Sequence, residues 1–199
     1  MNLTLILGAS RSGTSMVAQL CHDNGAWMGD VWKGEFAGKF GYEHYENKDF
    51  RDLCRGFLGI EQDRIGCLTD YNQDLRKFWD SLPDDVPVVL KYPKAFHLLH
   101  HFRSVHQIEP KIVYVMRDPW KRADSQTKKD NASHTQSLSE WEACYNTITV
   151  HTKGLPLHIA MFERFFIDPQ GETKRMLDFI GVQPNPMNTR CIDIGKRTV

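Results

Sequence analysis

Residues 3–15 read LTLILGASRSGTS, and this stretch decides how the chain is expected to fold. Residues 3–7 form a short, mainly apolar run that stops at Gly8, which is typical of a strand buried on both faces. The apolar residues after the turn recur at the spacing of one helix face, at Met16, Val17, Leu20 and Cys21. The chain is therefore predicted to open with a strand, a glycine-containing turn and a helix.

The turn after this first strand has the frame of a phosphate-binding loop. Gly8 and Gly13 bracket the pattern GxxxxG between a strand and a helix, and two hydroxyl residues follow. Small residues let backbone N–H groups turn inward toward an anion, and the start of the helix adds partial positive charge. The predicted anion ligands of the loop are Ser10, Arg11, Ser12, Gly13, Thr14 and Ser15.

The position of the cation indicates which anion the loop holds. In nucleotide hydrolases a lysine directly follows the second glycine and works with Mg²⁺ on a triphosphate. Here Thr14 occupies that position, and the cation is Arg11 inside the loop. A group that carries less charge than a phosphoryl group, such as a sulfuryl group, can be transferred without that lysine and its metal. We therefore expect a reaction that requires no metal.

The rest of the chain alternates short apolar strands with helical patterns. Further strands are predicted at 86–90, 111–116 and 156–161. Helices are predicted near 47–58, 72–81, 94–107, 119–129, 137–152 and 171–180. Ser137 and Glu140 have the spacing of a capping box at the start of the fifth of these helices. The alternation favours an α/β fold of three layers, with a mainly parallel central sheet and helices on both faces.

Composition limits the class of protein and its partners. The 199 residues include 25 basic and 25 acidic side chains, and 41% are hydrophobic, enough for one domain over residues 1–199 with a sizeable core. Balanced charge predicts no binding to nucleic acid and no insertion into a membrane. The apolar run at the N-terminus is too short for a signal peptide or a membrane span, so a cytoplasmic location is expected. The five cysteines are expected to be reduced, because their number is odd and no CxxC pair occurs.

Residues 24–46 fit neither the strand period nor the helix period. Glycines and aromatic residues alternate there, which is typical of a lid over an active site or of a packed surface loop. The segment follows the first helix, so it is able to fold back over the carboxyl ends of the strands, where α/β proteins bind ligands. We expect it to form a lid that contacts the molecule to which the enzyme transfers a group, called the acceptor below.

A second anion site is predicted at the end of another strand. In residues 111–125, KIVYVMRDPWKRADS, Arg117 directly follows the strand, and Asp118-Pro119 then starts a helix. Ser125 lies about two turns into that helix. An arginine at the strand end and a serine that reaches back toward it are suited to hold one phosphate.

These motifs resemble those of sulfotransferases that use 3′-phosphoadenosine 5′-phosphosulfate (PAPS). GASRSGTSMVAQL is similar to the 5′-phosphosulfate loop of this family, in the form with arginine inside the loop that many small bacterial members have. Arg117 and Ser125 match its 3′-phosphate motif, which implies that they bind the phosphate that distinguishes PAPS from ATP. The resemblance implies a phosphate-loop fold, PAPS as donor, the nucleotide PAP as product and a small-molecule acceptor with a hydroxyl or amine group.

Two further stretches resemble the family. VVLKYPKAFHLL is similar to a strand that ends in Lys-x-Pro-Arg/Lys, and it supplies Lys91. FERFFIDPQGETKRMLDFIGV is similar to a Tyr-Glu-Asp segment, with Phe162 and Arg164 as departures. The basic tail resembles a segment that closes over the 3′-phosphate, through Lys196 and Arg197.

Sulfuryl transfer needs cations for the leaving group and a base for the proton of the acceptor. Arg11 and Lys91 are the predicted cations. The segment GYEHYENKDF resembles the part of the family that carries the base, and Glu46 is the first choice there. His44 is the second, because other branches use histidine, and Glu43 remains possible.

Two alternatives remain open at this point. One is a phosphotransferase of the kinase type on the same fold, which would need the missing loop lysine and an aspartate for Mg²⁺. The other is a nucleotide-binding module without activity. The histidines of the helix near 94–107 do not have the spacing of a metal motif, so no metal site is predicted.

Overall fold

The computed structural model of this chain describes residues 2–32, 44–59, 68–184 and 186–192. Four parallel strands form its central sheet in the order β4-β1-β5-β6. Their bounds are β1 Leu3–Leu7, β4 Val88–Lys91, β5 Lys111–Met116 and β6 Leu157–Met161. All four predicted strands are present, and β4 begins two residues later than predicted, at 88 rather than 86.

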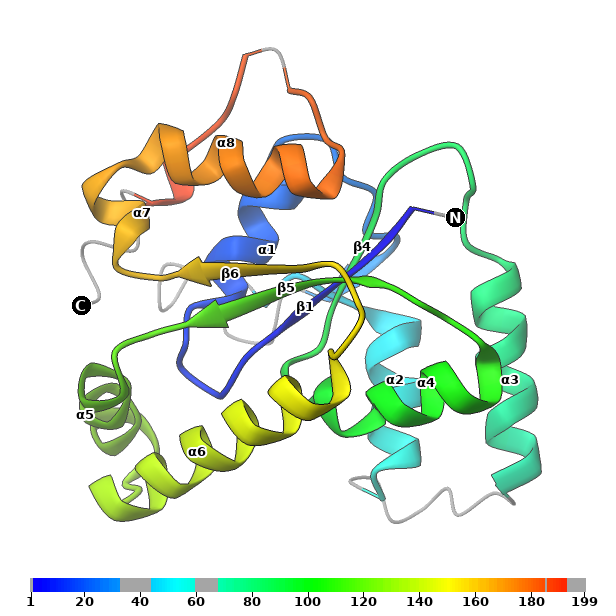
Figure 1. Cartoon of the computed structure of the whole chain (residues 1–199), viewed down its shortest axis with the longest axis horizontal. Coiled ribbons are helices and arrows are strands. Elements are labelled where there is room, and N and C mark those ends of the chain that lie inside the picture. Colours follow the sequence, from blue (N-terminus) through cyan, green and yellow to red (C-terminus); the bar gives the residue numbers. More distant parts are fainter. Residues whose placement is uncertain (1, 33–43, 60–67, 185, 193–199) are drawn as a thin grey trace.

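Helices cover both faces of this sheet (Figure 1). The helices are α1 Thr14–Asp23, α2 Lys48–Phe57, α3 Leu68–Asp80, α4 Leu99–His106, α5 Pro119–Asp130, α6 His134–His151, α7 Arg164–Ile167 and α8 Pro169–Ile180. A 3₁₀ helix, η1 Pro93–Leu98, precedes α4, so the helix predicted over 94–107 is divided in two. The predicted three-layer α/β fold is confirmed.

Alternate side chains of β1 show how the two faces are covered. Leu5 belongs to a buried cluster with Phe50 of α2 and Phe102 of α4. Ile6, its neighbour, belongs to the opposite cluster with Val17 of α1 and Leu177 of α8. Both faces of the strand are buried because successive side chains point to opposite sides of a sheet, which explains the continuous apolar run in the sequence.

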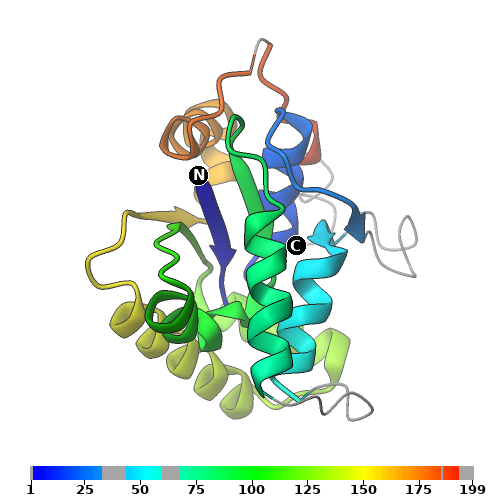
Figure 2. The ribbon, with the colours of Figure 1, turned by 90° about the vertical axis from the view of Figure 1, so that its right-hand side faces the viewer.

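The segment predicted as a lid has regular structure at its two ends. Val31–Trp32 form β2 and Glu46–Asn47 form β3, which pair antiparallel in a second, two-stranded sheet. Asn47 then caps α2, since its side chain accepts a hydrogen bond from the Phe50 N–H. Figure 2 shows α2 and α3 side by side. Residues 33–43, the middle of the predicted lid, lie outside the described residues.

The capping box predicted for the fifth helix is wrong. Helix α6 begins at His134, and its N-cap is Ser133, whose hydroxyl accepts a hydrogen bond from the Gln136 N–H at 3.1 Å. Ser137 is fully buried one turn inside the helix, and Glu140 forms an ion pair with Arg122. The sequence holds two successive patterns of the capping-box type, at 133–136 and 137–140, and the earlier one starts the helix.

Helix α5 begins as predicted, with Pro119 in its first turn. Asp118 is its N-cap, and the carboxylate accepts a hydrogen bond from the Lys121 N–H at 2.9 Å.

No helix within the described ranges is both long enough and apolar enough to span a membrane.

Candidate active site

The four strands are parallel, so their carboxyl ends lie at one edge of the sheet (Figure 1). The loop of residues 8–13 joins β1 to α1 at this edge. Lys91 is the last residue of β4, and Arg117 directly follows β5. Ligands of α/β proteins bind at the carboxyl edge of the sheet.

Backbone conformation explains why the loop needs its second glycine. Gly13 has a φ of 95°, in the left-handed region that side chains disfavour. The ring of Phe162, just after β6, lies 2.1 Å from the place where a Cβ of residue 13 would be. Arg11 also has a positive φ, 66°, without the freedom of a glycine. The loop therefore has a strained conformation that its surroundings must hold in place.

The two predicted anion motifs meet at Arg11. Its Nε lies 3.4 Å from the hydroxyl of Ser125 on α5, and its carbonyl accepts a hydrogen bond from Arg117 at 3.2 Å. The Arg117 guanidinium also lies over the ring of Phe162, 4.8 Å from its centroid. Segments more than a hundred residues apart in sequence thus form one continuous cationic cluster.

The hydroxyl residues of the loop differ in their surroundings. Ser12 and Thr14 are buried, while Ser15 is partly exposed. The carbonyl of Ser10 accepts a hydrogen bond from Arg122 at 2.6 Å. The Ser10 side chain interacts with the Glu140 carboxylate and helps to lower its pKa, so this predicted anion ligand lies near α6.

A buried ion pair stands beside this cluster. The Lys91 ammonium lies 2.7 Å from Glu46, and it also donates to the backbone carbonyl of His44 at 3.1 Å. The side chains of Lys91 and Glu46 are only 1% and 8% exposed. Burial lowers the pKa of Lys91 from its ordinary value, and the neighbouring Glu46 carboxylate offsets part of that shift. The structure therefore brings the predicted cation and the first-choice base into direct contact.

His44, the second-choice base, is held by an aromatic stack. Its ring lies on Trp32 of β2 with the centroids 4.8 Å apart, and the Arg51 guanidinium lies 4.5 Å from the Trp32 ring. Burial lowers the pKa of His44, the charge of Lys91 lowers it further, and Glu46 acts in the opposite direction. The imidazole is therefore mostly neutral at pH 7 and is able to accept a proton.

Some predicted residues cannot be placed. Glu43, Lys196 and Arg197 lie outside the described residues. Among the residues that are described, no group of three histidine, cysteine or acidic side chains is arranged to hold a metal ion.

Sequence reasoning missed Arg122 and the role of Phe162. Arg122 lies between Arg117 and Ser125 in the sequence but is fully buried beneath the loop. Its only signal is the helix period, which places it three residues before Ser125 on nearly the same face of α5. Phe162 is visible only as a departure from the family pattern, and its contact with Gly13 depends on the tertiary fold.

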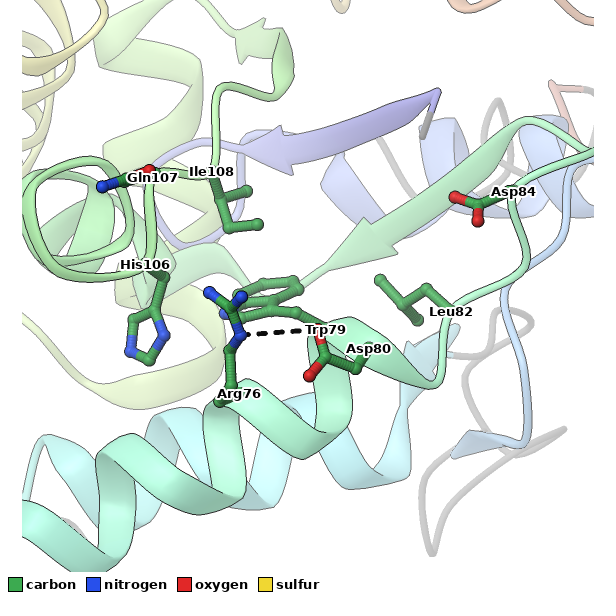
Figure 3. Close-up of a pocket in the computed structure, with 8 residues that line it drawn as sticks. All are labelled: Arg76, Trp79, Asp80, Leu82, Asp84, His106, Gln107 and Ile108. Atoms are coloured by element: carbon green, nitrogen blue, oxygen red, sulfur yellow. Dashed lines mark ion pairs between the residues drawn. The ribbon is translucent and has the colours of Figure 1, made fainter.

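A cavity of about 430 Å³ lies away from these residues, between the C-terminal ends of α3 and α4 (Figure 3). It is lined by Arg76, Trp79, Asp80, Leu82, Asp84, His106, Gln107 and Ile108. None of the predicted site residues belongs to this lining.

A parallel sheet with a glycine loop after β1, and with a second cationic segment after β5, defines an α/β protein of the phosphate-loop type. The family model of the sulfotransferase domain matches residues 2–194, and the chain belongs to this family. The family assignment makes the protein a sulfotransferase. No curated protein sequence matches the chain significantly.

Solved structures agree on the fold. The sulfotransferase domain of the Synechococcus PCC 7002 olefin synthase has a TM-score of 0.59 at 17% identity, covering 91% of this chain and 73% of that one. The sulfotransferase domain of the curacin biosynthetic pathway gives 0.54 at 14%, covering 90% and 74%. A sulfotransferase from Alicyclobacillus acidocaldarius gives 0.54 at 14%, covering 90% and 81%. At these identities the likeness establishes the fold alone.

Proposed function

We propose that this sulfotransferase takes its sulfuryl group from PAPS and transfers it to a hydroxyl or amine group of a small molecule. The observation that carries the proposal is the junction of the two anion motifs at Arg11, which contacts Ser125 and Arg117. A donor with phosphates at both its 5′ and 3′ positions requires two anion sites that lie next to each other. A nucleotide without the 3′-phosphate would leave the Arg117 cluster unused.

The residues of the loop suit the 5′ end of such a donor. In this proposal the backbone N–H groups of the loop and the start of α1 bind the 5′-phosphosulfate. Arg11 stabilises the charge that develops on the leaving 5′-phosphate, and Arg117 and Ser125 hold the 3′-phosphate. The basic tail residues Lys196 and Arg197 are proposed as additional ligands of the 3′-phosphate.

The buried pair suits the acceptor side of the reaction. In the proposed step the acceptor oxygen or nitrogen forms a bond to sulfur as the bond between sulfur and the 5′-phosphate oxygen breaks. The acceptor proton passes to Glu46, with His44 as the alternative base. Lys91 holds the Glu46 carboxylate in position, since its ammonium lies 2.7 Å away. The products are the sulfated acceptor and PAP.

Calorimetric titration with PAP, ATP and AMP, each without Mg²⁺, tests the donor. We expect PAP to bind and the other two nucleotides to bind at least about tenfold more weakly, because charged hydrogen bonds to the 3′-phosphate contribute about 1.5–3 kcal/mol each. Arg117→Ala should lose most of this preference. Lys121→Ala is the matched control, since it removes an exposed charge from the next helix turn.

Two results would contradict the proposal. ATP binding that depends on Mg²⁺, with PAP ignored, would favour an enzyme of the kinase type. PAP binding without sulfation of any acceptor in a panel of alcohols, phenols and amines would favour a nucleotide-binding module.

A further inference from the structure

Arg122 is a charged side chain buried within the protein, beneath the phosphate loop. It is fully buried, and it is the largest of the fully buried side chains in the described part of the chain. A buried guanidinium is costly unless acceptors surround it. Arg122 donates to the Ser10 carbonyl at 2.6 Å, to the Ser137 carbonyl, and to the Glu140 carboxylate at 2.7 Å. Its acceptors thus come from the loop and from α6.

Arginines hold two consecutive carbonyls of the loop. Arg122 donates a hydrogen bond to the carbonyl of Ser10, and Arg117 donates one to the carbonyl of Arg11. A trans peptide unit points its C=O and its N–H in opposite directions. Holding the Ser10 carbonyl toward Arg122 therefore fixes the direction of the next N–H, that of Arg11. Arg11 is also the residue with the unfavourable positive φ, so this conformation needs such support.

Glu140 holds Arg122 from the other side. Its carboxylate accepts from Arg122 at 2.7 Å and from Gln126 at 2.9 Å. Helix α6 is therefore joined to the loop through Arg122, which bonds both the Ser10 carbonyl and two residues of α6. Arg122 and Gln126 lie one turn apart on α5, so both reach the same carboxylate.

From these contacts we infer that Arg122, held by Glu140, is a positioning residue that sets the conformation of the phosphate loop and thereby the affinity for the 5′-phosphate end of the donor. This inference rests on the proposed function. It assigns Arg122 no contact with PAPS, because the side chain is fully buried and each of its three nitrogens already bonds Ser10, Ser137 or Glu140.

A pair of nucleotides separates positioning of the loop from general support of the fold. PAP has a 5′-phosphate for the loop, whereas adenosine 3′-monophosphate lacks it and depends on the 3′-phosphate site. We expect Arg122→Lys to weaken PAP binding by about 10- to 100-fold, the effect of losing one charged hydrogen bond, and to change binding of the monophosphate less than about threefold. Glu140→Gln, which keeps the shape, should weaken PAP binding by about three- to tenfold.

The control for lost stability is Glu172→Gln on α8. Glu172 is buried and pairs with Arg175 at 2.8 Å, so this variant also removes a buried carboxylate from an ion pair. We expect it to lower Tm and to keep the wild-type affinity for PAP. Calorimetry well below the Tm of each variant gives the affinities, and thermal unfolding gives Tm.

Each other outcome overturns the inference in a recognisable way. Wild-type affinity for PAP in Arg122→Lys would show that the loop holds its conformation without Arg122. Equal losses for both nucleotides would show that Arg122 only supports the fold. If the wild-type protein fails to bind PAP at all, the proposed function falls, and the inference falls with it.

Discussion

Glu46 and Lys91 form a pair in which either group could take part in proton transfer. The pair is buried, and its atoms are 2.7 Å apart. Burial lowers the pKa of Lys91, and the neighbouring carboxylate offsets part of that shift. Glu46 is the partner with carboxylate lone pairs that can receive a proton, and its contact with Lys91 places it at the end of β4.

We predict that Glu46→Gln lowers kcat by about 10²- to 10⁴-fold, the usual contribution of a general base. Glutamine keeps the shape and accepts a hydrogen bond from Lys91, but it does not take up a proton. The affinity for PAP should stay within a few fold of wild type, because Glu46 is not among the proposed phosphate ligands. Turnover is measured with whichever acceptor the wild-type enzyme sulfates.

His44→Gln is the matched comparison. Its ring stacks on Trp32, and the bond from Lys91 goes to its backbone carbonyl, so we expect a smaller loss of kcat than for Glu46→Gln. The reverse order would make His44 the base. Unchanged turnover in both variants would exclude both assignments.

Two constraints require a glycine at position 13: its positive φ and its packing against Phe162, which follows β6. We predict that Gly13→Ala lowers stability by roughly 1–3 kcal/mol or more, because an added Cβ would lie 2.1 Å from the Phe162 ring and φ is 95°. Denaturant unfolding measures the change. In the double variant with Phe162→Ala, the contact is gone and only the cost of the positive φ remains for the alanine at position 13.

The two single effects should therefore not add. A double-mutant cycle is expected to give a favourable coupling of about 1 kcal/mol or more between positions 13 and 162. Additive losses would mean that the ring moves aside freely, and the requirement for glycine would then come from the backbone alone.

Strands and helices of this chain could be predicted because their patterns are local. The run of residues 3–7 and the pattern after it indicate a buried strand, a turn and a helix, and the structure has β1 and α1 at these places. The helix start at Ser133 was missed because Ser137 offers a second pattern of the same kind, and burial decides between them. Local sequence does not contain that information.

The joining of distant segments was only partly predictable. The two anion motifs were expected at one edge of the sheet, because parallel strands end together. Contacts beneath the loop were not, since Arg122, Glu140 and Ser10 come from three elements and their meeting depends on how α5 packs on α6. Arginine on a helix is usually exposed, so nothing in the sequence marks one that is buried.

The described histidines are expected to make the stability of the whole fold depend on pH. Burial lowers the pKa of several of them below the ordinary value, namely His44, His97, His101, His106 and His158. For such groups the unfolded chain binds more protons than the folded chain between the lowered pKa and about 6.5. The stability that these neutral histidines contribute is therefore fully present above about pH 6.5, and it is lost as the pH falls through the lowered pKa values.

His106 is suited to test this dependence. It is only 4% exposed in the lining of the cavity between α3 and α4 (Figure 3), and its Nε2 has no hydrogen-bond partner within the described residues. Burial, His101 and the charge of Arg76 all lower its pKa. Protonation of His106 therefore places an added charge in a poorly solvated position beside a cation.

We predict that Tm falls as the pH decreases from about 7.5 to 5.5, and that His106→Gln makes this fall shallower. Carboxylates with ordinary pKa values near 4 contribute little in that range, so the histidines dominate the slope. Thermal unfolding of the wild type and the variant in matched buffers measures both slopes. Parallel profiles would mean that His106 does not contribute. A Tm that rises on acidification would mean that the folded chain binds more protons than the unfolded chain, contrary to the burial of these side chains.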